Sequence, residues 1–167
     1  RDAIAIDTGP LQARVVRRGF NVLKSLKVDS KELITDKGRG LVITLPDGKE
    51  VVADPPNDAE VVQAGPMKAI LILRGKFAEL HDGLLGYQVH LTFYAGRKFV
   101  KSQIWLRNNG RHGYASRKKK WHPEWFAFDG LALELGLGLG EKITATCEGV
   151  SADNSQPFSV TQYVKPM

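Results

Sequence analysis

The chain has 167 residues, of which 43% are hydrophobic and 25% are charged. This composition is typical of one globular domain with a substantial core. No apolar run approaches the roughly 20 residues that a membrane-spanning helix needs. The net charge of +6 favours anionic partners such as nucleic acid, acidic polysaccharide or a membrane surface. A solvated surface with surplus lysine explains the same charge equally well.

The ends of the chain leave its compartment open. The N-terminal residues RDAIAIDTGPL lack both the apolar stretch and the cleavage pattern of a signal peptide. A strand-like run begins almost at residue 1 without an initiator methionine, which predicts a piece of a longer protein, although a processed secreted protein would look the same. The single cysteine, Cys147, has no partner for an internal disulfide or a zinc site, and its alternating context predicts a packed core thiol.

The first half of the chain is predicted to form short strands separated by turns. These strands cover residues 3–6, 11–16, 22–28, 41–45, 50–53, 60–63 and 67–77. Residues 46–49, Pro-Asp-Gly-Lys, predict a hairpin turn because proline presets the turn and glycine accepts a positive φ. The nearly continuous apolar run 69–73 predicts a central strand or one buried on both faces.

The segment 84–109 predicts an antiparallel hairpin with a defined register. If Tyr94 lies opposite Phe99 across a turn at residues 95–98, apolar and polar side chains sort onto opposite faces. The apolar pairs are then Tyr87 with Leu106, Val89 with Ile104 and Phe93 with Val100. The polar pairs are Gln88 with Trp105, His90 with Gln103 and Thr92 with Lys101.

The remaining chain is predicted to continue in the same manner. Residues 109–124 form a basic irregular loop, and strands follow at 125–139, 143–147 and 158–163. No segment shows a sustained 3.6-residue period, so regularly spaced short strands predict an all-β chain, a large antiparallel β-sandwich in a single domain over residues 1–167. Gly136, Gly138 and Gly140 alternate along one strand and predict a face where something packs closely rather than a phosphate loop.

Motifs for catalysis and for metal binding are missing. His81, His90, His112 and His122 have no metal-ligand spacing, and no nucleophile motif surrounds Cys147. We therefore predict no catalytic residue, no metal site and no cofactor from the sequence.

Two surfaces are candidates for binding. The first is the basic loop. Its Lys118 and His122 would attract the charged backbone of an anionic polymer, and Trp121 would stack on its rings; the alternative is a solvated loop tip. The second is the polar face of the hairpin, which carries His90, Lys101, Gln103, Trp105 and Arg107. A tryptophan that points outward from a strand is an exposed apolar patch, which indicates that a ligand or another domain covers it. A sugar ring or a base would stack there, or a neighbouring domain would dock, and docking is the simpler interpretation for a piece of a longer chain.

Several segments together resemble a known family. The sequences IDTGPL at 6–11, PDGKEV at 46–51, AGPMKAIL at 64–71, LLGYQVHLTFYAGRKFVK at 84–101 and FDGLALELGLGLG at 128–140 are similar to the central β-sandwich domain of exo-rhamnogalacturonan-lyase-like proteins. The resemblance implies a supersandwich like the central domains of polysaccharide lyases, between a small β-barrel and an α/α toroid. It covers most of residues 3–139, does not extend to the basic loop, and transfers no catalytic residue.

Three functions follow in order of preference. The first is an accessory sandwich domain of a polysaccharide-lyase-like protein, which packs against neighbouring domains of its parent chain and contributes to binding acidic polysaccharide. The second is a stand-alone carbohydrate-binding module for anionic polysaccharide. A nucleic-acid binder comes last, because the chain lacks any fold signature for nucleic-acid readout.

Overall fold

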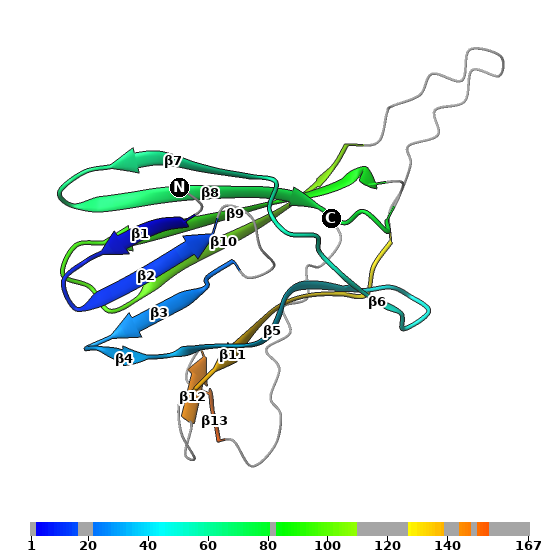
Figure 1. The fold of residues 1–167 in the computed structure, drawn as a ribbon. Coiled ribbons are helices and arrows are strands. Elements are labelled where there is room, and N and C mark those ends of the chain that lie inside the picture. The colour runs from blue at the N-terminus through cyan, green and yellow to red at the C-terminus, as the bar shows by residue number, and fades with distance from the viewer. Residues whose placement is uncertain are drawn as a thin grey trace. The chain divides into compact units, whose positions relative to one another are not determined.

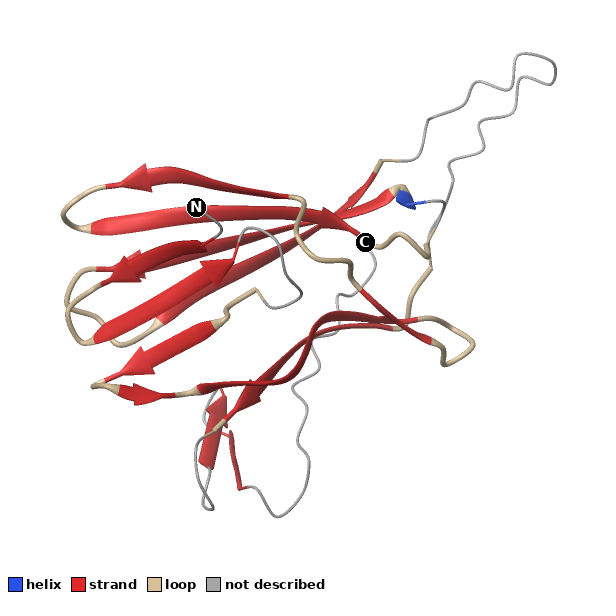
Figure 2. Ribbon diagram, in the orientation of Figure 1, coloured by secondary structure: helices blue, strands red, loops and turns tan. Residues whose placement is uncertain are grey.

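The chain folds almost entirely into β-strands, as the computed structural model shows for residues 3–16, 22–80, 83–109, 127–138, 144–147 and 150–153 (Figures 1 and 2). The strands in these ranges are β1 (Ala3–Asp7), β2 (Leu11–Val16), β3 (Ser25–Val28), β4 (Lys31–Glu32), β5 (Ile34–Thr44), β6 (Glu50–Val52), β7 (Asp58–Ala64), β8 (Lys68–Lys76), β9 (Leu85–Tyr94), β10 (Val100–Asn108), β11 (Gly130–Leu137), β12 (Thr144–Cys147) and β13 (Val150–Asp153). All their pairings are antiparallel. The predicted all-β sandwich is thus confirmed.

The strands belong to two compact units, residues 1–137 and 138–167. In the described part of the second unit, β12 pairs with β13 from Cys147 opposite Val150 to Thr144 opposite Asp153. The backbone of Cys147 thus lies in a strand, as expected. The predicted strand at 158–163 lies outside the described residues, and a single domain over the whole chain stays a prediction.

One sheet of the first unit has the strand order β1-β2-β3-β4. Strict alternation in β2 sends Leu11, Ala13 and Val15 inward and leaves Gln12 and Arg14 outside. The β3–β4 turn consists of Asp29 and Ser30, both with positive φ. Two such residues match the twist that a tight hairpin requires, so they bring Lys27 opposite Glu32.

A second sheet has the order β10-β9-β8-β7, with the predicted hairpin at its edge. The register is the one expected, from Val100 opposite Phe93 to Asn108 opposite Leu85. Its turn uses Gly96 at a φ of 70°, and the ring centroids of Tyr94 and Phe99 lie 5.8 Å apart. The apolar run in β8 is a central strand of this sheet, between β9 and β7, as predicted.

The third sheet, β11-β5-β6, contains the predicted turn at residues 46–49, where Gly48 has a φ of 81°. β5 and β11 approach closely beside an irregularity between Glu134 and Gly136. A Cβ on Gly38 would lie 2.6 Å from the backbone nitrogen of Gly136, so this position accepts only glycine without a shift of the strand. The residue whose missing side chain allows this approach is Gly38, and the close packing expected on the glycine face of residues 136–140 stays a prediction.

A single hydrophobic core joins the three sheets of the first unit. It combines alternate residues of β2, β8 and β9 with Leu41 and Ile43 of β5 and Val51 of β6. Phe77, Leu73 and Val89 are completely buried. The outer faces of the sheets are left to polar and half-buried side chains.

Strand boundaries differ from prediction in several places; for example, the strand expected at 125–139 covers only Gly130–Leu137 among the described residues. Residues 22–24 were expected in a strand, but Val22 and Leu23 lie in the core outside any strand. Apolar alternation reports burial, and a buried loop residue produces the same signal. Residues 34–40 were not expected in a strand because they are polar and glycine-containing, yet they form the first part of β5 through pairing with β11. None of the described residues forms a helix that is long and apolar enough to cross a membrane.

Candidate functional site

The outer face of the β9–β10 hairpin presents an exposed aromatic side chain. Trp105 is 55% exposed, and its ring stacks on His90 with a centroid distance of 5.5 Å and an interplanar angle of 14°. The register places Trp105 opposite Gln88 and His90 opposite Gln103, so the stacked rings form a diagonal pair. The imidazole holds the indole in one orientation while leaving much of it accessible to solvent.

Two cations lie on either side of this aromatic pair. Lys101, Gln103, Trp105 and Arg107 alternate along β10, which is an edge strand, and all four are exposed. Alternate residues of a strand lie about 6.8 Å apart. Neither Lys101 nor Arg107 forms an ion pair with any carboxylate in the part of the chain that the structure describes. We call His90, Lys101, Gln103, Trp105 and Arg107 the Trp105 face.

Near the opposite edge of the same outer face, a positive charge is paired within the sheet. Arg74 of β8 pairs with Asp58 at 2.7 Å and with Glu60 at 2.8 Å, both from β7. Hydrogen bonds from Asp58 and Glu60 raise the pKa of the Arg74 guanidinium. The two carboxylates more than offset the charge of Arg74, whereas Lys101 and Arg107 beside Trp105 keep theirs.

Polar groups in the centre of the sheet are less accessible than the sequence predicted. Thr92 lies on the predicted polar face opposite Lys101, but it is only 8% exposed. Its other neighbour across the sheet is Ile70 of β8, and both neighbouring side chains are long enough to cover a threonine. His90 is half-buried, and its Nε2 lies 3.4 Å from Oε1 of Gln88. Thr92 therefore belongs to the structural part of this face.

The other candidate surface is the basic loop, and its residues Lys118, Trp121 and His122 lie outside the described residues. Among the residues that are described, no group of three or more histidine, cysteine, aspartate or glutamate side chains is arranged to hold a metal ion.

The structure also brings together a set of charged residues that the sequence analysis did not single out. A hollow of about 450 Å³ opens on the outer face of the β1–β4 sheet. It is lined by Gln12, Arg14, Lys24, Ser25, Lys27, Glu32, Ile34 and Thr35. We call it the cationic hollow. The one sequence signal for it is the alternation in β2, which predicts that Gln12 and Arg14 share the outer side of the strand. That alternation does not reveal which strand pairs with β2.

Comparison with known proteins adds no identification. No protein-family model matches the chain, and no curated protein matches it. A function for this chain is therefore inferred from the geometry of the two outer faces and from the resemblance of its sequence segments.

Proposed function

We propose that this chain is an accessory β-sandwich domain of a polysaccharide-lyase-like protein and that the Trp105 face contributes to binding acidic polysaccharide. The observation that carries the proposal is an exposed tryptophan, stacked on His90, between two cations that form no ion pair with any described residue. An indole ring offers an apolar surface on which the hydrophobic face of a sugar ring stacks. Lys101 and Arg107, three alternate-residue intervals apart along β10, are placed to bind carboxylates of separate sugars along an extended polymer.

The geometry explains why a polymer suits this face better than a small molecule. The Trp105 face is a row along one edge strand, so successive groups of an extended chain would meet successive side chains of β10. Gln103, which lies between Lys101 and Trp105, supplies both a donor and an acceptor for sugar hydroxyl groups. No carboxylate competes for the two cations among the residues described around them.

Docking of a neighbouring domain is the alternative use of the same face. An exposed tryptophan and an edge strand both favour contact with another protein surface. A docking partner would have to bring carboxylates to Lys101 and Arg107, because burying either cation without a partner is costly. An acidic polysaccharide carries its own carboxylates, so carbohydrate binding needs no second protein surface, and we place it first.

Calorimetric titration with oligogalacturonate and rhamnogalacturonan oligosaccharides tests the proposal. We expect saturable binding that weakens between about 50 and 300 mM salt, since added ions screen the cations. Trp105→Ala should weaken binding about tenfold or more, in line with about 1–3 kcal/mol for loss of an aromatic stacking platform. Phe99→Ala is the matched control, because Phe99 is an equally exposed aromatic residue in the same hairpin, 54% against 55%.

Charge variants separate the two contributions. Lys101→Gln with Arg107→Gln should weaken binding and reduce its dependence on salt. Lys49→Gln with Arg97→Gln removes the same formal charge from the turns at 46–49 and 95–98, outside the Trp105 face. Absence of binding at millimolar ligand, or equal affinities for Trp105→Ala and Phe99→Ala, would exclude carbohydrate binding by this face. The docking alternative would then be preferred.

A further inference from the structure

The cationic hollow lies on a different sheet from the Trp105 face and has no part in the proposed function. Residues Gln12 and Arg14 point out of β2, and pairing with β3 places them opposite Lys27 and Ser25. Lys24 reaches the same region because its backbone nitrogen donates to the carbonyl of Arg14 at 2.9 Å. The alternation of β2 and the short turn to β4 therefore collect side chains from four segments around one depression of about 450 Å³.

Positive charge predominates in this hollow. Arg14, Lys24 and Lys27 line it, and Glu32 is the one carboxylate among its lining residues. None of the three cations forms an ion pair with a carboxylate of the described chain. The lining thus has a formal charge of +2, which a doubly charged anion would neutralise.

Glu32 is held in place and stays ionised. Its carboxylate accepts hydrogen bonds from Ser25 Oγ at 2.6 Å, from the nitrogen of Leu26 at 2.8 Å and from the nitrogen of Ile34 at 3.4 Å. Burial by itself would raise the pKa of this carboxyl, but the bonds from Ser25 and from the backbone, with the charge of Lys27, lower it overall. A fixed carboxylate beside cations repels simple anions and accepts hydrogen bonds from hydroxyl groups.

We infer that the cationic hollow binds a small organic anion that carries hydroxyl groups and that it prefers a doubly charged anion to a singly charged one. The anionic group is bound by Arg14, Lys24 and Lys27. The hydroxyl groups donate to Glu32 and bind to the amide of Gln12 and the hydroxyl of Thr35. The volume is within the range of sites for small ligands, about 300–1,000 Å³.

Titration of the chain at low salt with three probes tests the inference. Glucose 6-phosphate has the expected charge and hydroxyl groups, methyl phosphate has the charge alone, and glucuronate has the hydroxyl groups with a single charge. We expect saturable binding of glucose 6-phosphate, at least about fivefold tighter than binding of either other probe. Chemical-shift changes should be largest at Arg14, Lys27 and Glu32.

Two sets of variants locate the binding. Arg14→Gln with Lys27→Gln should weaken glucose 6-phosphate binding about tenfold or more, whereas Lys49→Gln with Arg97→Gln, which removes equal charge elsewhere, should leave it within about twofold. Glu32→Gln should strengthen methyl phosphate binding and reduce the preference for glucose 6-phosphate, because the repulsion is lost and an NH2 donor replaces one of the two acceptor oxygens. Lys24→Gln repeats the charge test with a single change if the double variant is unstable.

Several outcomes would overturn the inference. These are absence of saturation with glucose 6-phosphate, equal losses in the two charge-matched double variants, and tighter binding of glucuronate than of glucose 6-phosphate. Trp105→Ala should not alter glucose 6-phosphate binding. A failure of the cationic hollow is therefore distinguishable from a failure of the Trp105 face.

Discussion

At the scale of single residues, the contact between Gly75 and Tyr87 is a strict constraint. The two lie opposite each other on β8 and β9. A Cβ on Gly75 would be 2.3 Å from the Tyr87 hydroxyl and 2.4 Å from Cζ of its ring. The tyrosine is held in that position, since its hydroxyl donates to the carbonyl of Asp54 at 2.8 Å and its ring packs edge-on against Phe77. Gly75 is therefore required by the position of a neighbouring side chain.

Gly75→Ala should lower the free energy of unfolding by about 1–3 kcal/mol, because the buried Tyr87 has to move and its hydrogen bond is strained. Urea unfolding followed by fluorescence measures the change. Gly65→Ala is the control, since the nearest atom to its Cβ would be 3.9 Å away. Equal unfolding midpoints for the two variants would show that Tyr87 adjusts without cost.

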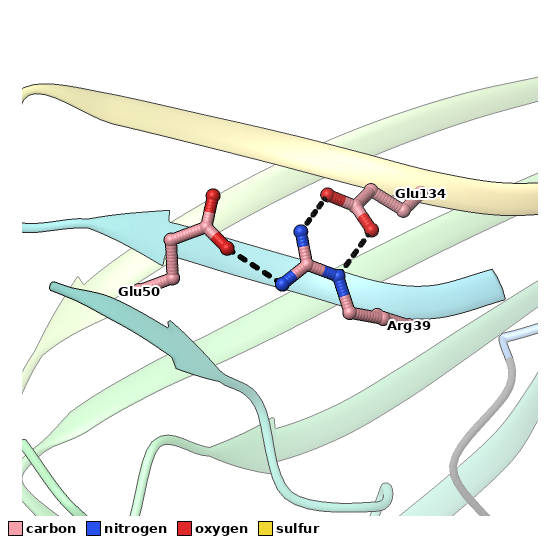
Figure 3. A network of polar contacts seen from close by, with 3 residues as sticks. All are labelled: Arg39, Glu50 and Glu134. Atoms are coloured by element: carbon pink, nitrogen blue, oxygen red, sulfur yellow. Dashed lines mark hydrogen bonds and ion pairs between the residues drawn. The ribbon is translucent and has the colours of Figure 1, made fainter. Parts of the chain in front are cut away.

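At the scale of elements, β5 is joined to both of its neighbours by one side chain. Arg39 binds Glu134 of β11 through Nε at 2.6 Å and Nη2 at 2.5 Å, and it binds Glu50 of β6 through Nη1 at 2.6 Å (Figure 3). The two bonds to Glu134 form a bidentate pair, the geometry that arginine and carboxylate favour. The hydrogen bonds from Arg39 lower the pKa of Glu134, although partial burial opposes the change.

This pKa shift predicts a pH-dependent contribution to stability. A carboxyl whose pKa is lower in the folded state stabilises the fold above its unfolded-state value, about 4.5, and loses that effect as the pH falls through the folded value. Glu134→Gln should therefore lower the thermal midpoint slightly at pH 7 and have progressively less effect below about pH 4.5. The decrease is expected to be small because all three side chains are partly exposed.

Thermal unfolding of Glu134→Gln and wild type at pH 3 and pH 7 measures this contribution. Glu79→Gln serves as the control, because its ion pair with Lys49 is longer, 3.6 Å, and more exposed. A difference from wild type that is the same at both pH values would mean that ionisation of Glu134 has no role.

At the scale of the whole first unit, stability depends on one core between the sheets. Leu73 and Ile72 are neighbours in β8 and have side chains of equal size, but Leu73 is completely buried in the core and Ile72 is half-buried on the outer face. Comparing alanine substitutions at these two positions therefore separates the stability that core burial provides from the stability that a residue provides by lying in β8.

Leu73→Ala should lower the free energy of unfolding by about 2–5 kcal/mol, because it removes buried methyl groups and leaves a cavity between the sheets. Ile72→Ala should cost clearly less, since its side chain is partly hydrated. Urea unfolding of both variants is the measurement. A larger loss for Ile72→Ala would contradict the assignment of the inner face.

Much of this fold follows from local sequence patterns. The register of the β9–β10 hairpin, the turn at 46–49 and the central position of β8 were all predicted, because a two-residue alternation and turn-forming residues act over a few positions. The Trp105 face was predicted for the same reason: once the register is known, Lys101, Gln103, Trp105 and Arg107 share one side of the strand.

The tertiary structure decided the features that depend on residues far apart in the sequence. Burial of Thr92, the demand for glycine at Gly75 and the joining of three strands by Arg39 arise from neighbouring strands whose pairing no single segment specifies. The cationic hollow likewise exists because β2, β3 and β4 lie side by side. Alternation along a strand determines which side chains share a face, whereas only the packing of that strand against others determines what each side chain touches and which charges remain free to bind a ligand.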